Sequence, residues 1–229
     1  MLLNDDLAVR SVVHAAKLDW MPSPTKGVDR RMLFRIGEEK ARATSIVRYA
    51  PASRFPRHAH PGGEEFLVLE GTFQDETGDY PAGSYVRNPP GTGHAPGADE
   101  GCTIFVKLWQ FRRDDREQIV HRPGEGKSAT PRPGASSSLI LFDSPYEEVR
   151  IEEWQAGAAI GLANSGGLEL LVLSGSFSDG EEQFERHSWL RLPAGTALHA
   201  RAGSEGTRVW FKFGPLLSDQ VCEFVTAAA

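Results

Sequence analysis

Hydrophobic residues occur along this chain in short runs that are rich in β-branched and aromatic side chains, and glycine and proline separate them. Typical runs are RATSIVRY (42–49), EFLVLEGTF (65–73), TIFVKLWQF (103–111) and TRVWFKF (207–213). No stretch of ten or more residues keeps a strong helical period, although residues 5–17 are ambiguous between helix and strand. Many short strands joined by turns predict an all-β sandwich or barrel with little helix.

The second half of the sequence repeats the first. EEFLVLEGTF (64–73) aligns with LELLVLSGSF (168–177) at an offset of 104 residues, and glycine and proline positions further along keep the same offset. If one residue is inserted ahead of the histidine, His94 falls on His199. A repeat with a single one-residue insertion predicts two copies of one β unit.

A segment rich in proline, glycine, serine and charged residues separates the two copies. This composition is typical of a linker, although the apolar pair Ile119 and Val120 within it could dock on a barrel and His121 is expected to be solvated. The predicted division is a first barrel at 1–111, a linker at 112–138 and a second barrel at 139–229.

The first copy carries a histidine-rich motif, His58-Ala-His60-Pro-Gly-Gly-Glu64. Alternate residues of a strand share a face, so His58 and His60 should point the same way, and the Pro-Gly-Gly turn brings Glu64 beside them. A second block, rich in glycine and proline, turns His94 inward. Three imidazoles and one carboxylate are suitable ligands for a divalent metal. The sequence therefore predicts a metal site formed by these four residues.

Two stretches, HAHPGGEEFLVLEG (58–71) and GSYVRNPPGTGH (83–94), make the chain similar to the cupin superfamily. Trp20 and the residues that follow it, together with the stretch leading into the first motif, resemble the ChrR-type cupins more closely. The resemblance implies two tandem cupin barrels, of the double-stranded β-helix or jelly-roll type. It also implies zinc bound by His58, His60, Glu64 and His94. Ala98 stands where cupins often have an asparagine that is not usually a ligand.

The resemblance is to the cupin half of the ChrR anti-sigma factor. The helical half of that protein, which binds sigma factor and carries a His-x3-Cys-x2-Cys motif, has no counterpart here, since only about twenty residues precede Trp20. We therefore expect a bicupin without the sigma-binding helical domain, and we do not expect it to sequester a sigma factor directly.

The second copy has lost most of the metal ligands. At the aligned positions, His58 becomes Leu162, His60 becomes Asn164 and Glu64 becomes Leu168. His199 is the one ligand position retained in this alignment, and a hydrogen-bonded structural histidine is its expected role. The sequence thus predicts a degenerate second barrel and one divalent metal per chain. Zinc is the first expectation for its identity, with iron, manganese or nickel as alternatives.

The surroundings of the predicted site are less clearly defined. Strand alternation from Glu64 places Phe66 and Val68 on the metal-facing side, where they would line a pocket. Three arginines could reach an anionic ligand at its mouth, although exposure to solvent is the simpler expectation: Arg48, Arg57 and Arg87. Cys102 is expected to be a buried free thiol, with redox sensing as the alternative.

Composition and charge restrict the class of protein. The chain has 229 residues, of which 40% are hydrophobic and 24% charged, with a net charge of −6 and two cysteines. This acidic balance argues against a nucleic-acid partner, and no apolar run approaches the roughly 20 residues of a membrane span. The acidic first residues do not resemble the basic start of a signal peptide. We expect a cytoplasmic protein with a small-molecule ligand or substrate, and a homodimer is a further expectation.

Two kinds of function remain open. Some ChrR-like cupins resemble dioxygenases that cleave diketones or dihydroxyacetophenone-like substrates, which implies a metal-dependent dioxygenase. The alternative is a non-catalytic zinc sensor or regulatory module related to anti-sigma factors, because three histidines and one glutamate can also close a tetrahedral zinc site. The sequence does not decide between them.

Overall fold

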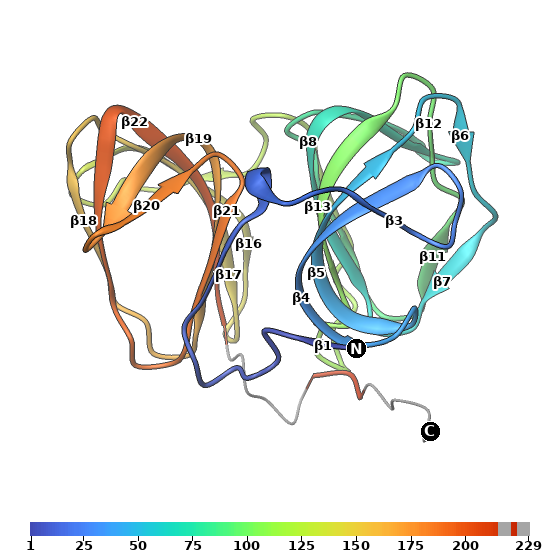
Figure 1. Ribbon diagram of the computed structural model, residues 1–229, viewed down its shortest axis with the longest axis horizontal. Coiled ribbons are helices and arrows are strands. Elements are labelled where there is room, and N and C mark those ends of the chain that lie inside the picture. The colour runs from blue at the N-terminus through green and yellow to red at the C-terminus, as the bar shows by residue number, and fades with distance from the viewer. Residues whose placement is uncertain (215–220, 224–229) are drawn as a thin grey trace. The chain divides into compact units, whose positions relative to one another are not determined.

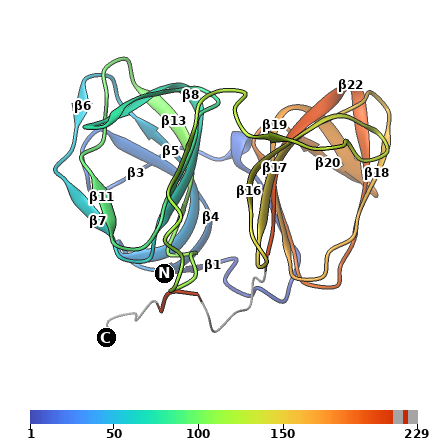
Figure 2. The ribbon, with the colours of Figure 1, turned by 180° about the vertical axis from the view of Figure 1, so that it is seen from behind.

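The protein is described here by a computed structural model that covers residues 1–214 and 221–223. These residues form β-strands joined by turns, with a single 3-10 turn, η1 (Ala15–Lys17). They divide into two compact units, each a rolled antiparallel barrel (Figures 1 and 2). The predicted all-β fold with two tandem cupin barrels is confirmed. Among the described residues, no helix is long and apolar enough to cross a membrane.

The two units are not continuous along the chain. The described part of unit 1 is Met1–Asp5, Asp19–Gly124 and residues 221–223, and that of unit 2 is Asp6–Leu18 and residues 125–214. The expected boundaries ran uninterrupted through 1–111 and 139–229, whereas the segment before Trp20 supplies a strand to unit 2. That segment was the one whose pattern was ambiguous.

Unit 1 is built on a sheet in which the strands follow the order β1, β4, β5, β13, β8, β10, β14. Their bounds are β1 Leu2–Leu3, β4 Val28–Gly37, β5 Ala41–Tyr49, β13 Cys102–Leu108, β8 Glu64–Asp75, β10 Tyr85–Asn88 and β14 Ile119–His121. Short strands extend it: β3 Met21–Pro22, β6 Ser53–Arg54, β9 Gly78–Pro81 and β12 Gly97–Ala98. A separate two-stranded ribbon joins β7 (His58–His60) to β11 (Thr92–His94).

Unit 2 repeats this arrangement in the order β15, β16, β17, β22, β19, β21, β2. The bounds are β15 Lys127–Ser128, β16 Ala135–Asp143, β17 Glu148–Trp154, β22 Leu198–Phe213, β19 Leu168–Asp179, β21 Ser188–Leu192 and β2 Ser11–His14. Two further strands complete it, with β18 (Ala159–Leu162) paired to β22 and β20 (Glu182–Glu185) paired to β19.

Each barrel receives an added strand at the equivalent position. In unit 1, β14 pairs with β10, so that Tyr85 lies opposite His121. In unit 2, β2 pairs with β21 in the same way. The added strands cover edges that would otherwise expose unpaired backbone groups. The docking that the sequence allowed for Ile119 and Val120 is observed as strand pairing, in which the side chain of Val120 stays exposed. His121 is not a solvated linker residue, since its ring stacks at 6.4 Å on that of Tyr85.

A buried apolar cluster fills each barrel. In unit 1 it consists of Phe66, Val68, Phe73, Tyr80, Val86, Ala98, Cys102, Ile104 and Val106. Cys102 belongs to this cluster as a free thiol, and burial raises its pKa to about 12. The thiolate that redox sensing would need is therefore disfavoured, and the structural interpretation of Cys102 holds.

Candidate metal centre

The ribbon of β7 and β11 places the three histidines side by side. His94 lies directly opposite His58, and Thr92 lies opposite His60. Registered residues of an antiparallel pair share a face, so the two strands turn all three imidazoles to the same side. The ribbon is short because glycines and prolines flank both strands, as the sequence motifs predicted.

Glu64 reaches the histidines through the turn that follows His60. Gly63 has a φ of +78°, a left-handed conformation that glycine adopts without strain, and its N–H donates to the carbonyl of His60 at 3.2 Å. A side chain at Gly63 would meet the ring of Phe111 at 2.3 Å. The turn therefore needs glycine for both its conformation and its packing, and it starts β8 with Glu64 beside the ribbon.

The four predicted ligands converge on one point. One donor atom from each of His58, His60, Glu64 and His94 lies within 4.8 Å of the others. Oε2 of Glu64 is 3.5 Å from Nε2 of His60 and 3.4 Å from Nε2 of His94. His60, Glu64 and His94 are buried, and His58 is exposed. Among the described residues, no other group of three or more such side chains is arranged to hold a metal ion.

The chemistry of these donors fits a divalent metal. Nε2 of His60 is buried and makes no hydrogen bond with any described residue, which is costly unless a further partner is bound. Burial lowers the pKa of His60, the neighbouring His94 and His58 lower it further, and Glu64 opposes them. A neutral imidazole is the form that coordinates a metal. Glu64 supplies the negative charge that compensates a dication.

The second ring nitrogen of each histidine, Nδ1, lies close to an oxygen atom of a neighbouring residue. Nδ1 of His58 lies 3.5 Å from the carbonyl of Pro56, and Nδ1 of His60 lies 3.3 Å from Oγ1 of Thr92. Such partners orient imidazole ligands and leave Nε2 for the metal. The arrangement around the site therefore directs all the Nε2 atoms inward.

Asp75 is the residue that sequence reasoning missed. Its Oδ2 lies 3.3 Å from Nδ1 of His94, while its Oδ1 accepts hydrogen bonds from the N–H of Thr77 at 2.8 Å and from the hydroxyl of Tyr80 at 3.2 Å. Burial opposes ionisation of Asp75, but the hydrogen bonds from His94 and Thr77 outweigh it and lower its pKa to about 2. In the sequence, Asp75-Glu-Thr77-Gly reads as a simple turn, which gives no signal of this role.

A cavity of about 260 Å³ opens beside the ligand cluster, and three of the four ligands line it. His58, His60 and Glu64 lie in its wall, together with apolar side chains that include Val47, Val106 and Leu108. Its polar wall also includes Arg30, Arg35 and Glu39.

The pocket residues predicted from strand alternation lie elsewhere. Phe66 and Val68 are each 1% exposed and belong to the buried cluster of unit 1, and neither lines this cavity. Phe66 packs at 4.7 Å on the ring of Phe73, which in turn lies 5.5 Å from the ring of His94. Phe66 therefore supports the site from within the core.

The three arginines proposed for the mouth of the pocket have other partners and do not line the cavity. Arg48 pairs with Asp29 at 2.7 Å on the surface. Arg57 pairs with Glu76 and donates to the carbonyl of Gly93 at 2.8 Å. The guanidinium of Arg87 is fully buried and pairs with Asp115.

Strand pairing corrects the alignment of the two copies at the last ligand. In unit 1, His58 lies opposite His94, and in unit 2 the equivalent Leu162 lies opposite Leu198. The 104-residue offset thus continues through this position. Gly97 still pairs with Gln74, as Arg201 pairs with Ser178, so the extra residue lies later, in the turn after β12. The prediction that His199 replaces His94 is wrong.

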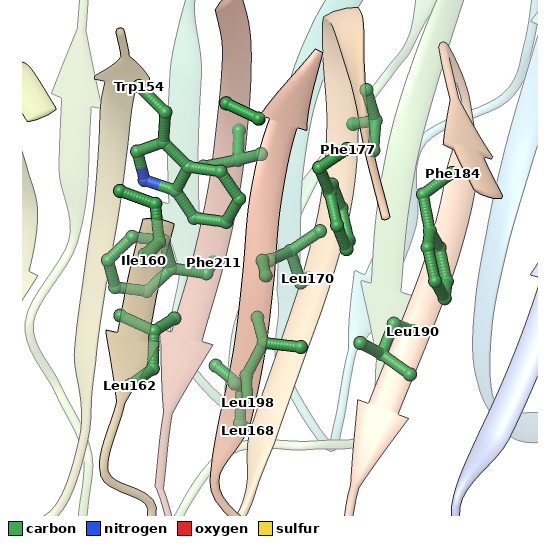
Figure 3. Close-up of a cluster of buried hydrophobic side chains, with 14 of the residues drawn as sticks. Trp154, Ile160, Leu162, Leu168, Leu170, Phe177, Phe184, Leu190, Leu198 and Phe211 are labelled. Atoms are coloured by element: carbon green, nitrogen blue, oxygen red, sulfur yellow. The ribbon is translucent and has the colours of Figure 1, made fainter. Parts of the chain in front are cut away.

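His199 instead points away from the barrel. It lies opposite Gly161 and its side chain is exposed, whereas we expected a hydrogen-bonded structural histidine at this position. All four ligand positions of unit 2 are therefore replaced by residues that are not ligands in a site of this kind: Leu162, Asn164, Leu168 and Leu198. The three leucines belong to the apolar cluster that Figure 3 shows.

Asn164, which takes the place of His60, is hydrogen-bonded, whereas the three leucines pack in the apolar cluster. Its Nδ2 approaches the carbonyls of Pro193 and Thr196 at 2.9 and 3.1 Å, and its Oδ1 accepts from the N–H of Gly167 at 2.7 Å. At the position of a metal ligand in unit 1, Asn164 therefore forms a structural link between two turns of unit 2.

Comparisons with known proteins agree with this architecture. The family model of the ChrR cupin-like domain matches residues 8–112. No match was found among curated proteins.

Several solved structures share the fold. A proposed dioxygenase from Nostoc punctiforme has a TM-score of 0.73 at 13% identity, over 95% of this chain and 87% of that one. The pirin YhhW of Escherichia coli in complex with nickel(II) has a TM-score of 0.65 at 14% identity, over 91% and 100%. An oxalate decarboxylase variant of B. subtilis has a TM-score of 0.59 at 14% identity, over 90% and 77%. At these identities the likeness concerns the fold alone. Residues 8–112 match the family model of the ChrR cupin-like domain, and the chain as a whole has the fold of the bicupins of known structure.

Proposed function

We propose that this protein binds one divalent metal in unit 1 through His58, His60, Glu64 and His94, and that a small molecule occupies the cavity beside it. The observation that supports this proposal is the convergence of four donor atoms within 4.8 Å at the wall of a 260 Å³ cavity. A fold-stabilising zinc site needs no cavity, whereas a site that exchanges ligands does. A cytoplasmic location is part of the proposal.

The residues at the cavity determine how a ligand would be bound and activated. A bound divalent metal would act as a Lewis acid toward an oxygen of the ligand. Glu64 compensates the charge of the metal, and Asp75 holds the proton of His94 on Nδ1. Apolar side chains from β5 and β13 limit the access of water. Zinc, iron, manganese and nickel all accept three imidazoles and a carboxylate.

Two functions are compatible with such a site. The first is an enzyme, for which a metal-dependent dioxygenase acting on a diketone or dihydroxyacetophenone-like substrate is the candidate. The second candidate is a non-catalytic sensor in which metal and ligand alter a protein contact. The cavity serves both, because each requires a ligand to reach the metal.

Metal analysis and oxygen uptake test the proposal. Protein purified without added metal is analysed for metals, stripped with a chelator and reloaded separately with zinc, iron(II), manganese(II) and nickel(II). We expect one equivalent per chain and loss of binding in the variant His60→Ala. Consumption of dioxygen with a panel of diketones by one of the reloaded forms would assign the enzyme class. Retention of full metal content in His60→Ala would contradict the proposed site.

A further inference from the structure

Two arginines of β4 lie in the wall of the cavity that is also lined by three of the metal ligands, His58, His60 and Glu64. Arg30 and Arg35 both line it, and Arg35 is only 4% exposed. The strand register connects Arg35 to the metal cluster, because Arg35 pairs with Ala43, Ala43 with Leu108, and Leu108 with Glu64. Registered residues of neighbouring antiparallel strands share a face. Arg35 and Glu64 are therefore on the same face of the sheet, in a single row that crosses four strands.

The two guanidinium groups are not equally neutralised. Arg30 forms a two-pronged pair with Glu39, with nitrogen–oxygen distances of 3.2 and 2.8 Å, yet its Nε is buried without a partner. Arg35 donates to the main-chain carbonyls of Glu38 and Glu39, the latter at 3.3 Å, and forms no ion pair with a described carboxylate. A buried cation that bonds only to carbonyls is costly unless an anion joins it.

The formal charge of the cavity points to the same conclusion. The charges of Arg30 and Arg35 balance those of Glu39 and Glu64, because the histidine ligands are neutral when they coordinate a metal. A divalent metal then leaves the cavity with a net charge of about +2. Such a cavity attracts an anion, and it does so most strongly when the metal is present.

We propose that the cavity binds a small carboxylate-bearing molecule whose carboxylate lies at Arg35 and at Nε of Arg30, while an oxygen at its other end reaches the metal. The inference rests on the proposed metal site and defines its ligand class. Arginine is suited to this role because its planar fork matches the two oxygens of a carboxylate. A volume of 260 Å³ corresponds to about nine water-sized volumes, which limits the ligand to a small metabolite.

A matched pair of ligands tests the ligand class. Pentane-2,4-dione and 2,4-dioxopentanoate share a diketone, and only the second carries a carboxylate. Both are titrated into protein loaded with cobalt(II), whose visible spectrum reports on ligands that reach the metal. We expect the carboxylate-bearing dione to bind about 10- to 100-fold more tightly, the range of a hydrogen-bonded charge pair. Equal affinity for the two ligands would overturn the proposal without any variant being made.

Variants then assign the effect to Arg35. In Arg35→Gln the preference for the carboxylate-bearing dione should disappear, while cobalt(II) affinity and the binding of pentane-2,4-dione stay the same. Arg35→Lys keeps the charge without the fork and should lose part of the preference. Arg48→Gln is the matched control, because Arg48 lies on the neighbouring strand and is exposed to solvent. A preference that survives in Arg35→Gln contradicts the assignment. Failure to take up cobalt(II) at all would instead reject the metal site itself.

Discussion

Nδ1 of His94 lies 3.3 Å from Oδ2 of Asp75, and Nε2 of the same ring faces Glu64 at 3.4 Å. Since the pKa of Asp75 is lowered to about 2, its carboxylate accepts a hydrogen bond and cannot donate one, which favours the His94 tautomer whose proton is on Nδ1. The free lone pair of Nε2 then points into the cluster of ligands. Asp75 is therefore a positioning residue for a ligand that lies 19 positions later in the chain.

Asp75→Asn should weaken metal binding by about 10- to 100-fold, as removal of such an orienting partner typically does. Asparagine can keep its carbonyl toward Thr77 and Tyr80, which turns its amide N–H toward His94. An N–H donor there favours the tautomer with the proton on Nε2, which does not bind metal. Competition with a coloured chelator measures the affinity.

Asp79→Asn serves as the control, because Asp79 is exposed and accepts a hydrogen bond from Gln74 at 2.8 Å. It should bind metal as the wild type does. The thermal transition of metal-free Asp75→Asn should stay close to that of metal-free wild type. A large drop in that transition, with unchanged metal affinity, would mean that Asp75 stabilises the turn without positioning His94.

Glu64→Gln keeps the size of the side chain but leaves three neutral imidazoles around a dication. We expect a loss of affinity greater than 100-fold, because a ligand contributes more than the partners that orient it. The barrel should stay folded, and its thermal transition in the presence of metal should fall by the lost binding term. Titration with zinc and calorimetry measure the two effects.

The adjacent Glu65 is a matched control on the opposite face of β8. It is 1% exposed and accepts a hydrogen bond from the hydroxyl of Tyr85 at 2.6 Å. Glu65→Gln should leave metal affinity unchanged and lower the stability of unit 1 by about 1–3 kcal/mol. Full metal retention in Glu64→Gln would exclude Glu64 as a ligand.

The chain should contain one tightly bound metal and not two. The pairing of Leu162 with Leu198 shows that a leucine, and not His199, occupies the position of His94 in unit 2. His199→Ala should therefore leave metal content at one equivalent, whereas His94→Ala should reduce it strongly. Elemental analysis of both variants checks this. A loss of metal in His199→Ala would mean that the exposed histidine contributes a ligand.

The sequence predicted the fold and the ligand cluster because their signals are local. Glycine and proline punctuate short strands, and the His58-to-Glu64 motif places its ligands by strand parity and one turn. The fate of His94 in the second copy was not predictable in this way. An alignment gains by matching histidine with histidine, whereas the register of β18 on β22 fixes Leu198 at that position.

Contacts distant along the chain were also missed. Asp75 reads as a turn residue because it accepts a hydrogen bond from the N–H of Thr77, two positions later. Its contact with His94, in contrast, joins β8 to β11 and spans 19 positions of the chain. Arg30 and Arg35 lie in a strand whose inward face could not be identified, since β4 shifts register between Met32 and Phe34. A bulge reverses the side on which alternate residues lie.

Cys102 should not react with thiol reagents in the folded protein. Its side chain is buried and its pKa is raised to about 12, so almost no thiolate is present at pH 8. The variant Cys222→Ser isolates Cys102, since the chain has two cysteines. In that variant, reaction with a disulfide reagent at pH 8 should require unfolding by denaturant. Rapid reaction of the native protein would revive a redox role for Cys102.

Asn164→Ala should destabilise unit 2 without affecting the metal in unit 1. Alanine leaves the carbonyls of Pro193 and Thr196 and the N–H of Gly167 without the partner that Asn164 supplies. Loss of such a buried polar partner costs about 1–3 kcal/mol. Hydrogen exchange followed by mass spectrometry measures the effect within unit 2, where peptides from β18 and β21 should lose protection. Peptides from β7 and β11, as well as metal content, should not change. Unchanged protection in unit 2 would mean that water replaces Asn164 at little cost, and that its substitution for His60 carries no structural role.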